Sequence, residues 1–151
     1  GIIDFGCIKE VPEHFYTNYF ALINRDLMGD DERMGEIFRE LEFILEEDKP
    51  EQQTFFHGLF KQMIEILGRP FAQQTFNFGD DSYVDEVYAF FEYVANVQEL
   101  KSANAARGSQ HGLYINRTYF GLYTLLNDLK ANVRTTKPTW LMSKEELAEM
   151  V

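Results

Sequence analysis

The strongest constraint on the fold is the helical spacing of apolar residues over about residues 110–134. Side chains recur there at intervals of four and three, the period that places them on one face of an α-helix: Ile115, Tyr119, Leu122, Leu126, Leu129 and Val133. Similar stripes run from Met34 to Leu45, from Phe55 to Leu67 and from Val84 to Ala95. Each stripe must be covered by another element, so the pattern predicts a mainly α fold, a helical bundle of about five to six helices.

Proline, glycine and capping residues set the expected helix boundaries. Pro12 suits a first helical turn, and we predict a helix over about 12–27 that stops before Gly29. Asp81 or Ser82 caps a long helix that is expected to continue to Ala106. Residues 71–80 have no clear period and are predicted to form a loop or a single turn.

The two ends of the chain carry short elements in this prediction. Residues 1–8 are expected to form a buried strand in which Ile2, Ile3 and Phe5 surround Asp4. Ser143 and Glu146 have the spacing of a capping box, which predicts a short final helix. The expected organisation is therefore a single helical domain over 1–151, preceded by one short β-strand.

Charge and cysteine content exclude several classes of protein. The formal net charge is −11, which argues against a nucleic-acid partner and against docking on anionic lipid. Cys7 is the single cysteine, so an intramolecular disulfide and a Cys-rich zinc site are excluded. A reducing, cytoplasmic location is expected. The chain starts without Met inside the predicted strand, so we expect it to be part of a longer protein.

Several polar or charged side chains allow both a structural and a functional interpretation. His14, His57 and His111 are scattered and are expected to be surface or hydrogen-bonded structural residues. Glu46-Glu47-Asp48 is expected to be a solvated helix end rather than a cation site. Arg117 is either an anchor for a phosphate or for the Asp4 region, or a partner in an ordinary salt bridge.

An aromatic cluster and the single cysteine each allow two interpretations. The aromatic cluster of Phe55, Phe56 and Phe60 has helical spacing, which favours plain core over the lining of a cofactor pocket. Cys7 stands between Gly6 and Ile8, which favours a small buried hydrophobe over a reactive thiol.

Asp4-Phe5-Gly6 is the one triplet with a direct chemical implication. A strand that ends at Asp4 would present a hard carboxylate oxygen to a cleft, and Gly6 permits the turn that follows. Magnesium bound to a triphosphate requires such an oxygen ligand in a well-defined geometry. Val11-Pro12-Glu13 follows Gly6 after only a few residues, so there is no room for the activation segment of a standard protein kinase.

Longer stretches around this triplet resemble a known family. The sequences "IDFGCIKEVPEHF" and "RGSQHGLYINRTYFGLYTLLNDL" are similar to those of the AarF/UbiB family of atypical, protein-kinase-like proteins. The resemblance covers nearly the whole chain and is strongest over 1–20 and 107–130. It implies that the chain is part of a kinase-like C-terminal lobe, and that Asp4 corresponds to the family's metal-binding aspartate.

The resemblance also implies a function for the intact protein. Such proteins bind Mg²⁺ and ATP, have ATPase or kinase-like activity and support isoprenoid-quinone biosynthesis, often at membranes. The nucleotide loop, the Lys–Glu pair and the catalytic loop would lie upstream of Gly1, so this chain alone is expected to be inactive. A non-catalytic helical interaction module is the alternative.

The missing N-terminal part of the kinase-like domain is the expected partner. Without it, Ile2, Ile3 and Phe5 would form an exposed apolar edge. We therefore expect either a disordered start or a homo-oligomer formed through residues 1–8.

Overall fold

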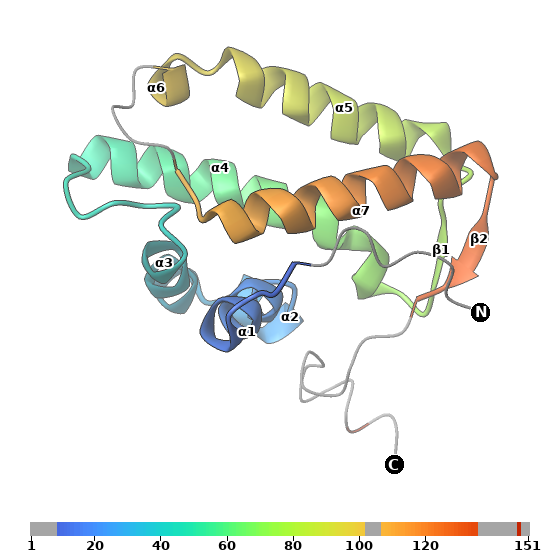
Figure 1. Ribbon diagram of the computed structural model, residues 1–151, viewed down its shortest axis with the longest axis horizontal. Coiled ribbons are helices and arrows are strands. Elements are labelled where there is room, and N and C mark those ends of the chain that lie inside the picture. The colour runs from blue at the N-terminus through green and yellow to red at the C-terminus, as the bar shows by residue number, and fades with distance from the viewer. Residues whose placement is uncertain (1–8, 102–106, 136–147, 149–151) are drawn as a thin grey trace.

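The computed structural model describes residues 9–101, 107–135 and 148 (Figure 1). It is mainly helical, as predicted, with one small sheet. The elements in chain order are α1 (Glu13–Ala21), α2 (Arg25–Met28), α3 (Asp31–Glu40), α4 (Pro50–Gly68), the 3₁₀ turn η1 (Arg69–Ala72), β1 (Thr75–Asn77), α5 (Asp81–Asn96), α6 (Gln98–Lys101), α7 (Gln110–Asp128) and β2 (Asn132–Arg134).

The long helices α4, α5 and α7 run alongside one another, and α1 to α3 lie below them on one side (Figure 1). The sheet closes the opposite end of the helices. Buried side chains from α1, α3, α4, α5 and α7 belong to one continuous cluster. Its most deeply buried large members include Phe38, Phe56 and Phe78.

Helix α3 is shorter than its apolar stripe. Asp30 caps its start by accepting a hydrogen bond from the Arg33 N–H at 2.9 Å. The helix ends at Glu40, and Glu42 has a φ of 60°, which turns the chain out of the helical path. The predicted continuation of this helix to Leu45 is therefore wrong, although Phe43 and Ile44 are buried in the turn.

A contact far along the chain explains this turn. The Gly108 N–H donates to the Glu42 carbonyl at 2.8 Å, so the turn is tied to the residues before α7. Gly108 has a φ of 78°, and a Cβ there would lie 2.8 Å from Phe43 Cε1. Only glycine fits both the left-handed backbone and this close approach.

A buried ion pair completes the same connection. Arg107 donates to both carboxylate oxygens of Asp48, at 2.6 and 2.5 Å. The two side chains are only 5% and 4% exposed. The guanidinium also lies 3.5 Å from the centre of the Phe56 ring, in cation–π geometry. The start of α7 is thus fixed to the loop between α3 and α4.

The sheet replaces two predicted features. β1 lies in the stretch predicted to be a loop, and β2 lies where the last predicted helix was expected to continue to residue 134. Lys130 has a φ of 49° and ends α7, after which Val133 pairs with Phe76 in an antiparallel register. Pairing between distant segments decided this structure, and helical spacing alone did not predict it.

Two other predicted helices are interrupted. The helix expected over 12–27 breaks after Ala21 into α1 and α2, and Asn24 accepts the first backbone hydrogen bonds of α2. The helix expected to reach Ala106 ends at Asn96, because Val97 takes an extended conformation before α6. The predicted strand over 1–8 and the predicted helix that Ser143 and Glu146 would start lie outside the described residues.

The ion pair yields a test of stability. Asp48→Asn should lower the free energy of unfolding by about 3–5 kcal/mol, because it leaves the Arg107 charge buried without its counter-charge. Glu47→Gln, at the exposed neighbouring carboxylate, should change it by no more than about 0.5 kcal/mol. Urea unfolding of the three chains measures both values.

The stabilisation that the Asp48–Arg107 pair provides should decrease as the pH falls. Hydrogen bonds from Arg107 hold the pKa of Asp48 below its usual range. The stabilisation is therefore complete above the ordinary pKa of about 3.9 and is lost as the pH falls through the folded-state value. The gap between the wild type and Asp48→Asn should narrow below about pH 4; a gap that stays constant would contradict the pairing.

Candidate functional site

Asp4, the predicted metal ligand, lies outside the described residues, as does Cys7. Among the residues that the structure does describe, no group of three or more His, Cys, Asp or Glu side chains could hold a metal ion. The described chain begins at Lys9, whose Nζ lies 5.2 Å from the centre of the Tyr114 ring on α7. The first described residue therefore contacts α7.

The two stretches that resemble AarF/UbiB proteins contact each other. On α1, the Phe15 ring lies 5.4 Å from the His111 ring on α7, measured between centroids. Gly112 lies against Phe15 and Tyr19, with 3.6 and 3.7 Å from an ideal Cβ to the nearest ring atoms. About ninety residues of sequence separate these partners, so the contact is tertiary.

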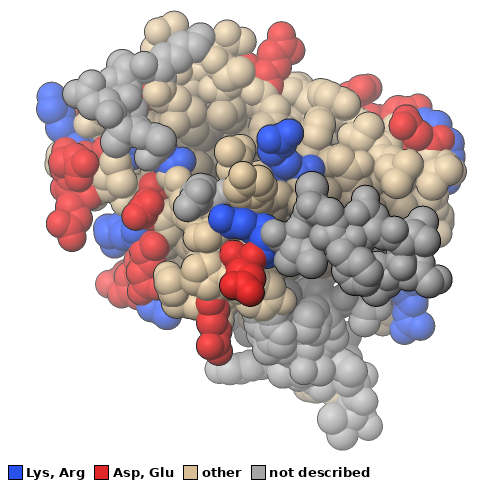
Figure 2. Space-filling view, in the orientation of Figure 1, with Lys and Arg blue, Asp and Glu red and all other residues tan. Residues whose placement is uncertain are grey.

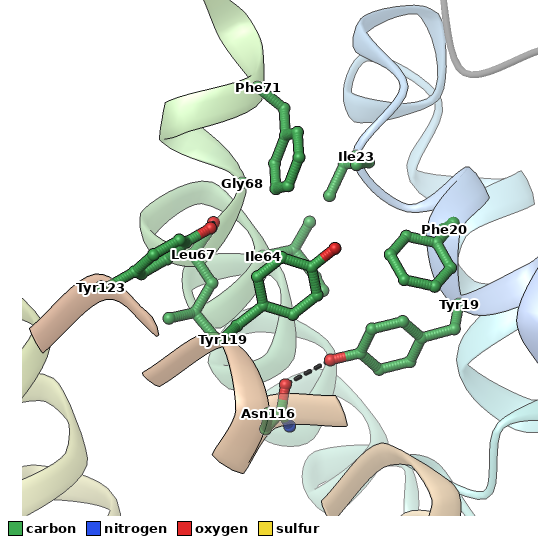
Figure 3. A pocket seen from close by; sticks show the side chains of 10 residues that line it. All are labelled: Tyr19, Phe20, Ile23, Ile64, Leu67, Gly68, Phe71, Asn116, Tyr119 and Tyr123. Carbon is green, nitrogen blue, oxygen red and sulfur yellow. Dashed lines mark hydrogen bonds between the residues drawn. The ribbon is translucent and has the colours of Figure 1, made fainter. Parts of the chain in front are cut away.

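An aromatic pocket lies at this junction, where α1, the end of α4, η1 and α7 meet (Figure 3). Its volume is about 30 Å³, room for about one water molecule. The side chains around it are mostly aromatic or aliphatic: Tyr19, Phe20, Ile23, Ile64, Leu67, Gly68, Phe71, Asn116, Tyr119 and Tyr123. The Tyr19 hydroxyl donates a hydrogen bond to Asn116 Oδ1, and this bond links α1 to α7 (Figure 3).

The buried tyrosines around this junction are fixed by hydrogen bonds to backbone. Tyr123 donates to the Leu67 carbonyl at 3.0 Å, and Tyr83 donates to the Ile66 carbonyl at 3.2 Å. Burial raises the pKa of Tyr19, Tyr83 and Tyr123 well above the ordinary value. These hydroxyls stay protonated at neutral pH. The described residues that line the pocket include no carboxylate and no histidine, and its tyrosines and aliphatic side chains pack the helices together.

A second cavity, of about 190 Å³, lies between α4, α5 and α6. Phe60, Met63, Phe91 and Leu100 are among its apolar walls, and Arg107 is its charged member. The predicted aromatic cluster is therefore divided: Phe56 is core, as favoured, while Phe60 borders this cavity. The charge of Arg107 is already matched by Asp48, which leaves an essentially apolar space.

The remaining candidate side chains occupy ordinary positions. His14 is exposed, and His57 Nε2 lies 3.2 Å from the Asp31 carbonyl oxygen, so both are surface or hydrogen-bonded residues as predicted. Glu46 and Glu47 are solvated, but Asp48 is buried, which corrects the interpretation of the acidic run. No sequence signal linked Asp48 to Arg107, because the two residues are 59 positions apart.

Arg117 and His111 are two polar residues of α7. Arg117 is exposed and forms no ion pair with any residue in the described ranges. His111 packs on Phe15, and its buried Nδ1 has no hydrogen-bond partner within the described part of the chain. Neither residue belongs to a catalytic arrangement with its described neighbours.

The outer face of α7 is apolar and exposed. Leu122, Leu125 and Leu129 are 45%, 55% and 67% exposed, although Leu122 and Leu129 belong to the stripe predicted to be buried. Tyr114 lies on the same helix and is also exposed. Charged side chains crowd the left of the view around α3 and are sparser over α5 and α7 (Figure 2). Several large apolar side chains of α7 are therefore in contact with solvent.

Within the described residues, no helix combines the length and apolar character that crossing a bilayer requires. Comparison with protein-family models, with curated proteins and with solved structures finds no match to this chain. The AarF/UbiB resemblance rests on the quoted residues of the two stretches.

The buried tyrosines predict a loss of stability in alkali. The free energy of unfolding is unaffected by the ionisation of these tyrosines below their ordinary pKa of about 10 and falls as the pH rises above it. It falls because the tyrosines of the unfolded chain ionise, while the buried hydroxyls of the folded chain remain protonated. Tyr83→Phe should reduce this loss, and Tyr93→Phe, at an exposed tyrosine on α5, should leave it unchanged.

Urea unfolding at about pH 8 and pH 10.5, together with phenolate absorbance, measures the effect. Tyr19, Tyr83 and Tyr123 should ionise only as the chain unfolds, because burial raises the pKa of each hydroxyl. Ionisation of all 8 tyrosines in a single step while the chain remains folded would show that these three are not buried as described.

Proposed function

We propose that this chain is the later part of the C-terminal lobe of an AarF/UbiB-like atypical kinase or ATPase. In the intact protein Asp4 would be a ligand of the Mg²⁺ that accompanies ATP. The observation that carries the proposal is the packing of α1 against α7. These helices belong to the two stretches that resemble the family, and Tyr19 and Asn116 join them by a hydrogen bond.

The described chain begins close to this packed pair of helices. Only three residues separate Lys9 from α1, which begins at Glu13 directly after Pro12. The first buried residue of α1, Phe15, lies against α7. A metal-binding carboxylate must be held in a well-defined position, and under this proposal the packed pair of α1 and α7 would supply the rigid support.

One carboxylate does not make an active site. Phosphoryl transfer requires the metal, the nucleotide and a positioned acceptor together. The described residues contain no group of three or more side chains that could hold a metal ion, and under this proposal the other ligands of the Mg²⁺ are not among them. The chain on its own is accordingly proposed to be non-catalytic. A role of the parent protein in isoprenoid-quinone biosynthesis, at a membrane or in the cytoplasm, is part of the same proposal.

Calorimetric titration with ATP and Mg²⁺ tests the proposal. The protein that contains this chain together with the upstream lobe should bind Mg²⁺–ATP, and Asp4→Asn should weaken Mg²⁺-dependent binding at least about tenfold, because a direct metal ligand is lost. Asp85→Asn, at an exposed carboxylate of α5, is the matched control and should leave binding unchanged.

The isolated 151-residue chain should show little affinity for Mg²⁺–ATP in the same titration. Micromolar binding by this chain that disappears in Asp4→Asn would contradict the claim that it is inert alone. Unchanged binding in the larger protein after Asp4→Asn would contradict the metal role.

The exposed face of α7 favours a second candidate, a helical interaction module without catalysis. Under the first proposal, the coding sequence upstream of Gly1 should encode a lysine-bearing lobe and a His-Gly-Asp loop. Their absence would favour the interaction module.

A further inference from the structure

We propose that the cavity between α4, α5 and α6 binds a small neutral organic molecule, one with a ring-sized apolar body and a single oxygen acceptor. The acceptor takes a hydrogen bond from the Nε–H of Arg107, and the apolar body lies among the side chains of the three helices. The proposal goes beyond the binding of Mg²⁺–ATP and does not depend on it.

Arg107 has one donor that its protein partners leave unused. Its two terminal nitrogens donate to the carboxylate oxygens of Asp48, and Phe56 lies against the guanidinium at 3.5 Å. The Nε atom is buried and has no hydrogen-bond partner in the described part of the chain. A buried donor without an acceptor carries a desolvation cost, which an oxygen atom of a ligand would remove. The arginine that carries this donor also lines the cavity.

The other described walls of the cavity are apolar. Phe60, Phe90 and Phe91 contribute aromatic rings, while Met63 and Val94 contribute thioether and aliphatic surface. Binding sites for small molecules commonly combine such walls with very few polar groups, which fix the orientation of the ligand. One donor among apolar walls therefore favours a ligand with one acceptor and an apolar body.

The size of the cavity admits a substituted ring. Its volume is about 190 Å³. An apolar cavity of about 150 Å³ is large enough for benzene, so this one has room for a six-membered ring with a small substituent that carries the oxygen. The pocket at the junction of α1 and α7, with about 30 Å³, is too small for the same molecule.

Contacts outside the cavity hold its walls in place. The Phe60 ring stacks on Phe43, with 4.4 Å between the centroids. The Phe91 ring meets Phe120 edge to face at 5.6 Å. The buried ion pair fixes Arg107. A side chain that turned inward to fill the space would lose these contacts, so the cavity is largely pre-formed.

The charge balance selects a neutral ligand. Asp48 lies 2.5 and 2.6 Å from the terminal nitrogens of Arg107, so the charge of the guanidinium is already matched. An anion in the cavity would lose its water and find no free counter-charge, and a cation would face the guanidinium. A ketone, ester or amide oxygen accepts from Nε–H and brings no charge. These groups define the ligand class.

Two probes of equal shape test the proposal on the 151-residue chain. Acetophenone has a carbonyl oxygen where α-methylstyrene has a CH₂ group. Both should bind saturably at one site in titrations followed by nuclear magnetic resonance. Intermolecular nuclear Overhauser effects should connect each bound probe with the methyl groups of Met63 and Val94, because both residues line the cavity. This measurement needs no variant.

Val94→Phe places a ring inside the cavity and should weaken the binding of both probes at least about tenfold, because it occupies the space that their rings would fill. Ala95→Phe is the matched control. It adds a ring at the exposed neighbouring position and should leave binding unchanged. Circular dichroism checks that both variants are folded.

Arg107→Lys tests the donor, because lysine keeps the charge opposite Asp48 and has no Nε–H. The ratio of acetophenone affinity to α-methylstyrene affinity should fall about tenfold in this variant. Comparing ratios cancels the different hydration of the two probes. In the wild type, acetophenone should also slow the exchange of the Arg107 Nε–H with water more than α-methylstyrene does, which decides the point if the variant does not fold.

Three results would overturn the proposal. The first is the absence of saturable binding by both probes, or contacts of the bound probes away from Met63 and Val94. The second is equal binding by folded Val94→Phe and Ala95→Phe. The third is equal protection of the Arg107 Nε–H by both probes, which would show that the ligand oxygen does not accept from this donor.

Discussion

The buried pair of Arg107 and Asp48 is the interaction on which the arrangement of the helices depends. It joins the loop after α3 to the start of α7 across 59 residues of sequence, and Phe56 of α4 stacks on the same guanidinium. Removal of either partner would leave a charge in the core, so the pair fixes one geometry rather than adding general stability. Gly108, pressed against Phe43, sets the direction in which α7 leaves this point.

Helix α7, once fixed there, has two faces with different roles. Its inner face contacts α1 through Gly112 and Asn116, and Tyr123 reaches the carbonyl that α4 presents at Leu67. Its outer face exposes leucines that no described residue covers fully. The inner face explains how α1 and α7, which are distant in the sequence, form one unit.

Local patterns predicted the helices well and their ends poorly. The stripe from Phe55 to Leu67 became α4, because Pro50 and the Gln52 side chain, which accepts from the Lys49 N–H, define its start locally. The stripe from Met34 overshot, because the turn at Glu42 depends on Gly108, and the strand at Val133 depends on Phe76. The Asp-Phe-Gly triplet identified a candidate ligand from sequence. The aromatic junction and the Asp48–Arg107 pair could not be predicted, since both consist of partners that are distant in the chain.

The central claim is that α1 and α7, which are distant in the sequence, form one packed unit. A double-mutant cycle with Tyr19→Phe and Asn116→Ala, followed by urea unfolding, tests it most directly. The hydrogen bond between these side chains predicts a coupling of about 0.5–1.5 kcal/mol, so the double variant should lose less stability than the sum of the two single losses. Strictly additive losses would show that the two residues do not meet, and would contradict the account.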